Sequence, residues 1–494
     1  MYSLGVDLGS SSIKLSVLDI ETGNCLATVS VPENEMLIKA PQHGWAEQEP
    51  YEWWQNFKDG LVLLKNKFKV DLTSIKCIGI SYQMHGLVLV DNNLEPVRSS
   101  IIWCDSRAAQ IGDKTYDKIG HSECQNMILG SPANFTASKL KWVKDNQPEI
   151  YNKAKYMMLP GDFIAMKLTG LAQTSTSGLS EAALWHFQEK RLAHEVLSAM
   201  DLSADLVPQV VASFGKHAVI SKNIAKELGL CANAVVSYRA GDQANNALSL
   251  NVLNAGEIAT TAGTSAVIYG VSSSNSYDEQ NRINTFLHIN NTDTHTSNGV
   301  LVCINGSGIL YQWLRRLLSI DKKEMISYYK LNEMSAKSES GSKGLLFYPF
   351  GNGVERIFNN KEAFSGISNL NFNIHQPEDV VRAACEGIVF AMNYGFEIMR
   401  GVGINGKIVR AGQANLFLSP VFREIFANTT NTTLELYNTS GSEGAARGAA
   451  YGAGYYNTLT EAFERLQCLE RIEPSTSLTS RYKEIYSNWK NNIK

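Results

Sequence analysis

The stretch that decides the fold is Leu4-Gly5-Val6-Asp7-Leu8-Gly9-Ser10-Ser11-Ser12-Ile13-Lys14-Leu15-Ser16-Val17-Leu18-Asp19. Two short apolar runs flank a turn of glycine and serine, which predicts a β-hairpin. Gly9 lets the backbone come close to a ligand, and the N–H groups of such a turn suit an anion. Asp7 beside a bound phosphate would need a metal ion between the two charges. Taken alone, the hairpin indicates either Mg²⁺-nucleotide binding or a solvated serine turn.

The same pattern returns in the second half of the chain. Strand, glycine-hydroxyl turn and strand recur as Gly256-Glu257-Ile258-Ala259-Thr260-Thr261-Ala262-Gly263-Thr264-Ser265-Ala266-Val267-Ile268-Tyr269-Gly270. Two such hairpins predict a duplicated fold with a phosphate-binding turn in each half. We place the boundary near residues 247–256, which predicts an N-terminal domain over 1–250 and a C-terminal domain over 251–494.

Length and composition agree with two globular domains. The chain has 494 residues, and its net charge of −3 comes without any run of Lys or Arg. A chain of this length exceeds one ordinary core, and the charge makes nucleic acid or an acidic membrane an unexpected partner. The 8 cysteines are scattered without metal-ligand spacing, which is typical of free thiols in a reducing compartment. With no leader pattern and no run of membrane-spanning length, we expect a cytoplasmic protein.

Two helices can be predicted from their apolar spacing. One begins at Pro50, and its apolar stripe is expected to be core: Trp53, Phe57, Leu61, Leu64 and Phe68. The other runs from Glu378 to about Arg400 with apolar residues in register. A third helical segment, residues 444–450, is built of small residues, which favours a close approach to a sheet or another helix.

Polar clusters follow two apolar runs in the first half of the chain. Gln83, Met84 and His85 come after the strand at 77–80, and the second cluster, after Ile101-Ile102, consists of Trp103, Asp105 and Arg107. In open α/β sheets ligands bind beyond the carboxyl ends of the strands, so both clusters are candidate substrate contacts. The alternatives are a loop histidine at 85 and a local ion pair between Asp105 and Arg107.

Asp242 stands where a strand at 234–236 gives way to a helix of small residues. Small neighbours leave room for a ligand, and a carboxylate there could serve as a general base. It could also cap the helix N-terminus, and the two roles are compatible.

Several motifs are missing from the sequence. It has no Walker A pattern, no HRD and DFG pair, and no GxGxxG after a strand, which excludes P-loop ATPases, protein kinases and the usual dinucleotide fold. The remaining hypothesis is a two-domain nucleotide-binding protein in which the turns of two β-hairpins bind the phosphates.

Together these pieces resemble the FGGY family of carbohydrate kinases over nearly the whole chain, from Leu4 to about Tyr455. The resemblance implies an α/β, duplicated, two-domain actin-like ATPase (ribonuclease-H-like) fold with a cleft between the domains. It implies that Asp242 is the catalytic base and that Asp7 lies near the metal, with both as candidate Mg²⁺ contacts. The ATP contacts it implies are Ser10, Ser11, Ser12, Lys14, Gly263, Thr264, Ser265, Gly308, Gln312, Gly412, Gln413 and Asn415.

Within the family, the segments at 45–48, 83–86 and 103–107 resemble the branch that phosphorylates D-xylulose. That resemblance implies Met84 and His85 as sugar contacts, and D-xylulose 5-phosphate as product. The turn Ala411-Gly412-Gln413-Ala414 departs from the family's Gly-Gly-Gly-Ala, which leaves nucleotide preference open. Another ketose or polyol kinase (ribulose, fuculose, glycerol) is one alternative. An actin- or chaperone-like ATPase that gates a protein partner is the other, and a homodimer is also an open alternative.

Overall fold

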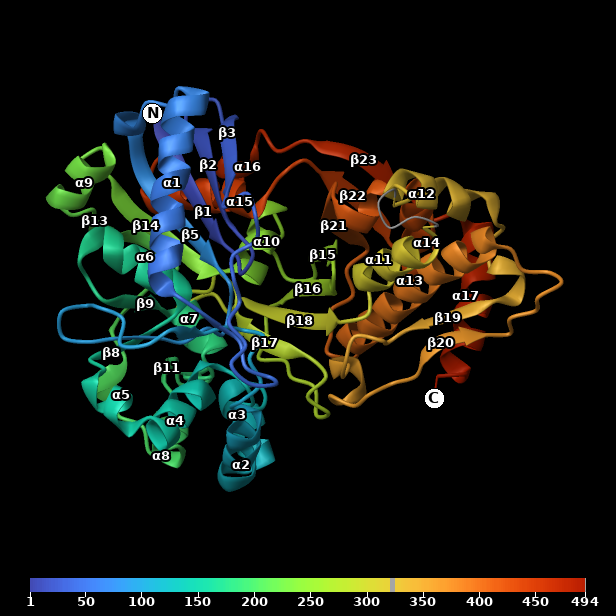
Figure 1. Cartoon of the computed structure of the whole chain (residues 1–494), viewed down its shortest axis with the longest axis horizontal. Coiled ribbons are helices and arrows are strands. Elements are labelled where there is room, and N and C mark those ends of the chain that lie inside the picture. The colour runs from blue at the N-terminus through green and yellow to red at the C-terminus, as the bar shows by residue number, and fades with distance from the viewer. Residues whose placement is uncertain (320–324, 494) are drawn as a thin grey trace.

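The computed structural model describes residues 1–319 and 325–493, which form two lobes, each built around one sheet (Figure 1). The first sheet has six strands. Their spatial order is β13 (Phe214–Val219), β14 (Val235–Gly241), β5 (Ile75–Tyr82), β1 (Tyr2–Leu8), β2 (Ile13–Asp19) and β3 (Cys25–Val31).

The predicted first hairpin is confirmed. β1 and β2 pair antiparallel on either side of the turn 9–12, and β5 runs parallel to β1 on its other edge. Leu4, Val6 and Leu8 are fully buried, because alternate residues of a central strand face the helices that cover the sheet. Asp7 therefore ends up at the carboxyl end of a buried central strand.

The second sheet repeats the first. Its seven strands are ordered β17 (Asn284–Leu287), β18 (Asn298–Ile304), β16 (Ala266–Ser272), β15 (Ile258–Ala262), β21 (Ile408–Gly412), β22 (Thr433–Tyr437) and β23 (Cys468–Ile472). From β18 to β23, the first three strands pair antiparallel, the next two are added parallel, and the edge strand is antiparallel. The first sheet has the same pattern when it is followed from β3 to β13. This order, with β17 as an addition, confirms the predicted duplication.

Helices cover both faces of the first sheet. α1 (Pro50–Phe68) and α6 (Pro160–Thr169) pack on one face, and α15 (Gly441–Gly452) packs on the other. A Cβ at Gly5 would lie 1.8 Å from the carbonyl oxygen of Ser442, and one at Gly79 would lie 2.1 Å from that of Ala445. Glycines in β1 and β5 thus admit the small-residue helix, as its composition predicted.

α15 comes from the C-terminal half of the chain but lies among the strands of the first lobe, as does α16 (Leu459–Phe463) (Figure 1). The predicted boundary near residue 250 falls between α10 (Asp242–Ser249) and β15. This boundary stays a prediction. α15 follows it in sequence but packs on the sheet of the first lobe.

Smaller elements complete the first lobe. The helices are α2 (Ala109–Ile119), α3 (His121–Ile128), α4 (Thr136–Asn146), α5 (Pro148–Lys153), α7 (Thr176–Glu181), α8 (His194–Ala199) and α9 (Lys222–Leu228). Four short strand pairs are β4 (Glu47–Gln48) with β7 (Ser100–Ile101), β6 (Val88–Val90) with β8 (Tyr156–Met158), β9 (Gln173–Ser175) with β12 (Gln209–Val211), and β10 (Trp185–His186) with β11 (Arg191–Leu192).

The second lobe has α13 (Pro377–Gly401) as its central helix, close to the predicted bounds. Around it lie α11 (Gly308–Leu317), α12 (Tyr328–Lys337), α14 (Pro420–Thr430), α17 (Thr476–Asn491) and the pair β19 (Leu346–Pro349) and β20 (Ser365–Ser368). Among the helices that the structure describes, none combines the length and apolar character needed to cross a membrane.

Two local expectations were wrong. Phe68, the last residue of α1, is 42% exposed, whereas the other four residues of the stripe are buried. β7, which precedes Trp103, pairs with β4 and lies outside the six-stranded sheet, whereas β5, which precedes Gln83, is central to it. The strand-end rule therefore applies to the first polar cluster and not to the second.

Candidate active site

The turn after β1 is compact and faces an acidic residue. The N–H of Gly9 donates to the carbonyl of Ser12 at 3.0 Å, which closes the turn. Asp7 stands beside Ser81 of β5 in the parallel register, and the Ser81 hydroxyl donates to Asp7 Oδ1 at 2.9 Å. Burial raises the pKa of Asp7, and the charge of Lys14, its partner across the hairpin, partly offsets that rise.

Asp242 meets this turn from β14. That strand ends at Gly241, and Asp242 is the first residue of α10 rather than its N-cap. A cavity of about 300 Å³ is lined by Asp7, Gly9, Ser10, Ser11, Ser12, Lys14, Gln83, Trp103 and Asp242. Burial and the neighbouring charge of Asp7 raise the pKa of Asp242 to about 7. A carboxylate with that pKa can exchange a proton near neutral pH.

A glutamine that the sequence analysis gave no role holds the turn in place. Gln48 donates to the backbone carbonyl of Ser10 at 2.7 Å, and its Oε1 accepts from Gln83 at 3.1 Å and from Trp53 at 3.2 Å. The other amide atom of Gln83, Oε1, is buried without a hydrogen-bond partner among the described residues. An acceptor left free beside a cavity suits a ligand hydroxyl.

Met84 and His85 lie behind Gln83 and do not line this cavity. His85 has φ 60°, and its Nδ1 bonds the carbonyl of Glu181 at 2.8 Å while its own carbonyl accepts from Lys139 Nζ at 2.8 Å. Burial lowers the pKa of His85 to about 3, so the ring is neutral. With Nδ1–H committed to a carbonyl, Nε2 is left as an acceptor.

Trp103 lines the cavity, but Asp105 and Arg107 do not. Both are buried, and Arg107 Nη2 pairs with Asp105 at 2.6 Å, while Nη1 pairs with Glu47 at 2.7 Å. The Arg107 guanidinium lies 3.7 Å from the ring centroid of Trp45. The structure therefore gives these two residues the ion-pair arrangement, which fixes the segment carrying Trp103.

A buried carboxyl group near Asp242 was missed. Glu181, at the end of α7, is 2% exposed, accepts from the Tyr82 hydroxyl at 3.0 Å, and has a second oxygen without a partner among the described residues. Burial and the charge of Asp242 raise its pKa well above the ordinary value. Nothing in the local pattern of residues 176–181 marks this position, because its neighbours come from other segments.

The second glycine-hydroxyl turn lies beside a larger cavity of about 530 Å³. The N–H of Gly308 donates to the carbonyl of Gly263 at 2.8 Å, which joins the start of α11 to the turn. Of the predicted nucleotide contacts, Gly263, Thr264, Gly308, Gln312 and Asn415 line this cavity, and Ser265, Gly412 and Gln413 do not.

Residues that the sequence analysis missed make up most of the rest of that wall. They are Tyr311, Tyr328, Tyr329, Asn332, Leu416 and Leu418. Aromatic and apolar side chains with a few amides are typical of a site for a flat ring carrying polar edges. Tyr328, Tyr329 and Asn332 reach this wall because of where α12 packs, which the sequence alone does not specify.

The pair of carboxylates in the first lobe fits a divalent cation. Asp7 and Asp242 line one cavity, and the charge of Asp7 contributes to the raised pKa of Asp242. Within residues 1–319 and 325–493 no three Asp, Glu, His or Cys side chains converge as a metal cage. A cation held here would take these two carboxylates together with phosphate oxygens and water, which is how Mg²⁺ is usually held beside phosphates.

Comparisons with known proteins agree with this geometry. The N-terminal domain model of the FGGY family of carbohydrate kinases matches residues 2–249, and the C-terminal domain model matches residues 258–456. A xylulose kinase of Staphylococcus epidermidis is 30% identical over 98% of this chain and 95% of its own. One of Staphylococcus xylosus is 27% identical over 99% of both chains.

A solved structure shares the fold. The ligand-bound xylulose kinase of Lactobacillus acidophilus has a TM-score of 0.88 at 21% identity, over 99% of this chain and 97% of that one. The duplicated sheets, together with the shared fold of this structure, confirm the predicted actin-like ATPase fold.

The family models and the fold define a phosphotransferase with one candidate cavity in each lobe. The chain belongs to the FGGY family of carbohydrate kinases. It is a sugar kinase, which transfers a phosphoryl group to an alcohol, and its small-molecule substrates are a sugar and ATP.

Proposed function

We propose that the chain catalyses ATP-dependent phosphorylation of D-xylulose at its primary O5 hydroxyl, giving D-xylulose 5-phosphate and ADP. The observation that carries the proposal is the placement of Asp242 in one cavity with Asp7 and the first glycine-hydroxyl turn. The choice of sugar rests on the full-length similarity to proteins named xylulose kinase.

In the proposed reaction Asp242 accepts the proton of the sugar hydroxyl. The hydroxyl oxygen forms a bond to the γ-phosphorus of ATP, the bond from that phosphorus to the bridging oxygen breaks, and ADP leaves. Such a base typically contributes ~10²–10⁴-fold. The pKa of about 7 leaves a substantial fraction of Asp242 able to accept a proton at neutral pH.

Mg²⁺ would be held by Asp7 and Asp242, the two acids of that cavity. When bound, the ion would supply positive charge that neutralises the phosphates. Ser10, Ser11, Ser12 and Lys14 would bind phosphate oxygens from the first lobe, and Gly263, Thr264 and Ser265 from the second. Gly308, Gln312, Gly412, Gln413 and Asn415 would hold the rest of the nucleotide.

The sugar would lie against the first lobe. The unpaired Oε1 of Gln83 and the indole of Trp103 offer an acceptor and an apolar face on the cavity wall. Met84 and His85, predicted as sugar contacts, lie outside this cavity and would support Gln83 from behind. Asp105 and Arg107 would act by holding the Trp103 segment. Closure of the lobes would exclude water, which otherwise competes as acceptor.

The test is ADP release with D-xylulose, L-ribulose, D-ribulose, L-xylulose, L-fuculose and glycerol, each at the same concentration, and with no sugar. We expect release to rise strongly with D-xylulose alone. A larger rise with another sugar would assign the activity to that sugar. Equal release without any sugar would instead favour an ATPase that gates a protein partner.

A further inference from the structure

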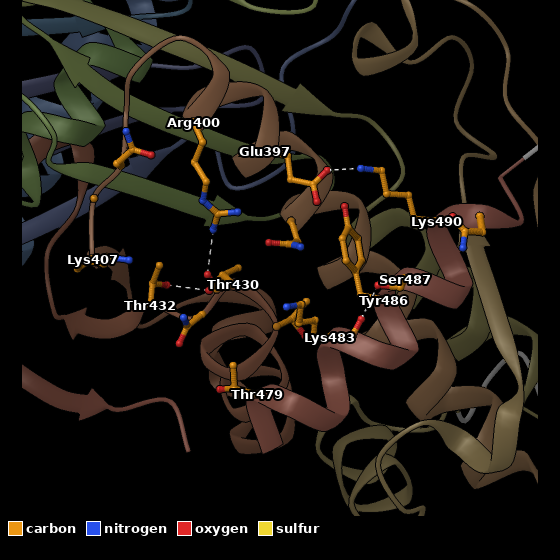
Figure 2. Close-up of a pocket in the computed structure, with 16 residues that line it drawn as sticks. Glu397, Arg400, Lys407, Thr430, Thr432, Thr479, Lys483, Tyr486, Ser487 and Lys490 are labelled. Carbon is orange, nitrogen blue, oxygen red and sulfur yellow. Dashed lines mark hydrogen bonds and ion pairs between the residues drawn. The ribbon is translucent and has the colours of Figure 1, made fainter. Parts of the chain in front are cut away.

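A cavity in the second lobe lies apart from the cleft. This cavity, open to solvent, has a volume of about 550 Å³ and lies between the C-terminal ends of α13 and α14 and one side of α17. Among the described residues, it shares no lining residue with the cavities beside the two glycine-hydroxyl turns. Figure 2 shows side chains from these three helices directed toward one common space. A volume in this range suits a small metabolite.

The wall of this cavity is rich in positive charge. Among the described residues that line it, one is a carboxylate, Glu397, and four are cationic: Arg400, Lys407, Lys483 and Lys490. Two of the four have partners: Lys490 pairs with Glu397 at 2.6 Å, and Arg400 donates to the carbonyl of Thr430 at 3.0 Å. Within residues 1–319 and 325–493, no ion pair or hydrogen bond reaches the ammonium groups of the other two.

Helix ends explain Arg400 but not the two free lysines. The carbonyls at a helix C-terminus attract cations, and Arg400 engages those of α14 in this way. Lys483 sits in the middle of α17, and Lys407 lies in the connection just before β21. Both are exposed residues that border the same solvent-open cavity, where an anion would bring them a partner.

A buried hydrogen-bond acceptor in the same wall indicates that a ligand would carry a donor group in addition to an anionic group. The side chain of Asn393 is 5% exposed and lies beside the Tyr486 hydroxyl; neither its Oδ1 nor that hydroxyl oxygen has a geometric hydrogen-bond partner among the described residues. The hydroxyl of Thr429, also on this wall, is likewise buried and unpartnered. Leaving such atoms unpaired is costly, and Oδ1 can only accept, so it suits a hydroxyl donor.

We propose that this cavity binds a small polyol phosphate, with the phosphate on Lys407 and Lys483 and a hydroxyl donating to Asn393 Oδ1. A phosphate alone would satisfy the lysines but not Asn393, and a neutral sugar would do the reverse. This proposal does not depend on which sugar the kinase phosphorylates, because none of the described residues that line this cavity also lines the cavity beside Asp242.

The test is calorimetric titration of the full chain with D-ribose 5-phosphate and, separately, with inorganic phosphate. We expect K407E/K483E to weaken D-ribose 5-phosphate binding about 10- to 100-fold, since charge-assisted hydrogen bonds to phosphate are lost. The matched control K65E/K216E makes the same change in net charge on exposed lysines of the first lobe and should bind as wild type. Lys14→Ala, which alters the cleft, should also leave this binding intact.

A further variant separates the two halves of the site. Asn393→Leu should bring the affinity for D-ribose 5-phosphate close to that for inorganic phosphate and leave the latter unchanged. Should K407E/K483E fold poorly by circular dichroism, K407A/K483A replaces it. No binding to wild type, binding lost with Lys14→Ala, or binding unchanged in the lysine variants would each overturn the proposal.

Discussion

The two glycine-hydroxyl turns have the same hairpin structure but differ in the charge of the residues around them. Each follows the first strand of its sheet, yet two residues before the turn's glycine the first lobe has Asp7 and the second has Thr261. The first cavity contains Asp7, Lys14 and Asp242, whereas the described residues around the second are neutral, and many are aromatic or apolar. On the proposed function, both turns would hold phosphate, and the charges around them would separate the reacting groups from the nucleoside.

The largest expected effect comes from removing the base in the charged cavity. Asp242→Asn should lower kcat by ~10²–10⁴-fold, because the amide cannot accept the hydroxyl proton. ATP affinity should stay nearly unchanged, since the second turn is untouched. Steady-state kinetics and nucleotide titration measure the two quantities. Asp113→Asn, on an exposed carboxylate of α2, is the control, and near-wild-type turnover in Asp242→Asn would remove that residue from the mechanism.

The next largest effect is expected from adding a methyl group at a glycine that packs against the second turn. A Cβ at Gly308 would lie 2.3 Å from the carbonyl oxygen of Gly263, whereas one at Gly412 would have its nearest neighbour at 4.0 Å. Gly308→Ala should raise the KM for ATP by about 5- to 100-fold, as expected from an overpacking strain of about 1–3 kcal/mol. Gly412→Ala, as its control, should change the KM little.

The same substitution in the first lobe sharpens the contrast. A Cβ at Gly441 would lie 2.6 Å from Asp7 Oδ2. Gly441→Ala should therefore lower kcat more than it raises the KM for ATP, the opposite of Gly308→Ala. Equal effects of both variants on both parameters would show that the division of labour between the turns is wrong.

A smaller effect is the acid sensitivity of the fold, which both lobes share. Burial lowers the pKa of His85 in the first lobe and of His288 in the second to about 3. Between pH 3 and 6.5 the unfolded chain binds a proton at each position and the folded chain does not, so stability falls as pH falls below 6.5. At pH 5 each histidine should cost about 2 kcal/mol.

Urea unfolding at several pH values measures this dependence. His288→Gln keeps an acceptor for the Tyr269 hydroxyl and a donor for the Val252 carbonyl, and it does not titrate. Its free energy of unfolding should therefore fall less between pH 7 and pH 5 than that of wild type. Identical slopes would contradict the buried neutral state of His288.

Local sequence patterns predicted the parts of this molecule that short segments determine. The two hairpins, α13 and the close approach of α15 follow from turn residues, apolar spacing and small side chains. Glu181, Gln48 and the tyrosines of α12 were not predicted as site residues, because their partners come from distant parts of the chain. Asp105 and Arg107 show the converse, since their spacing allowed either a ligand contact or an ion pair, and only packing distinguishes the two.

The central claim is that Asp242 faces a sugar hydroxyl across from the terminal phosphate of a magnesium-bound nucleotide. A crystal structure with D-xylulose, Mg²⁺ and a non-hydrolysable ATP analogue tests it most directly. The account predicts an Asp242 oxygen about 2.6–3.2 Å from the sugar's O5, with O5 in line with the terminal phosphorus. It also predicts that the adenine ring of the nucleotide lies beside Tyr328 and Asn415. A sugar bound with O5 beyond reach of Asp242, or that carboxylate engaged elsewhere, would contradict it.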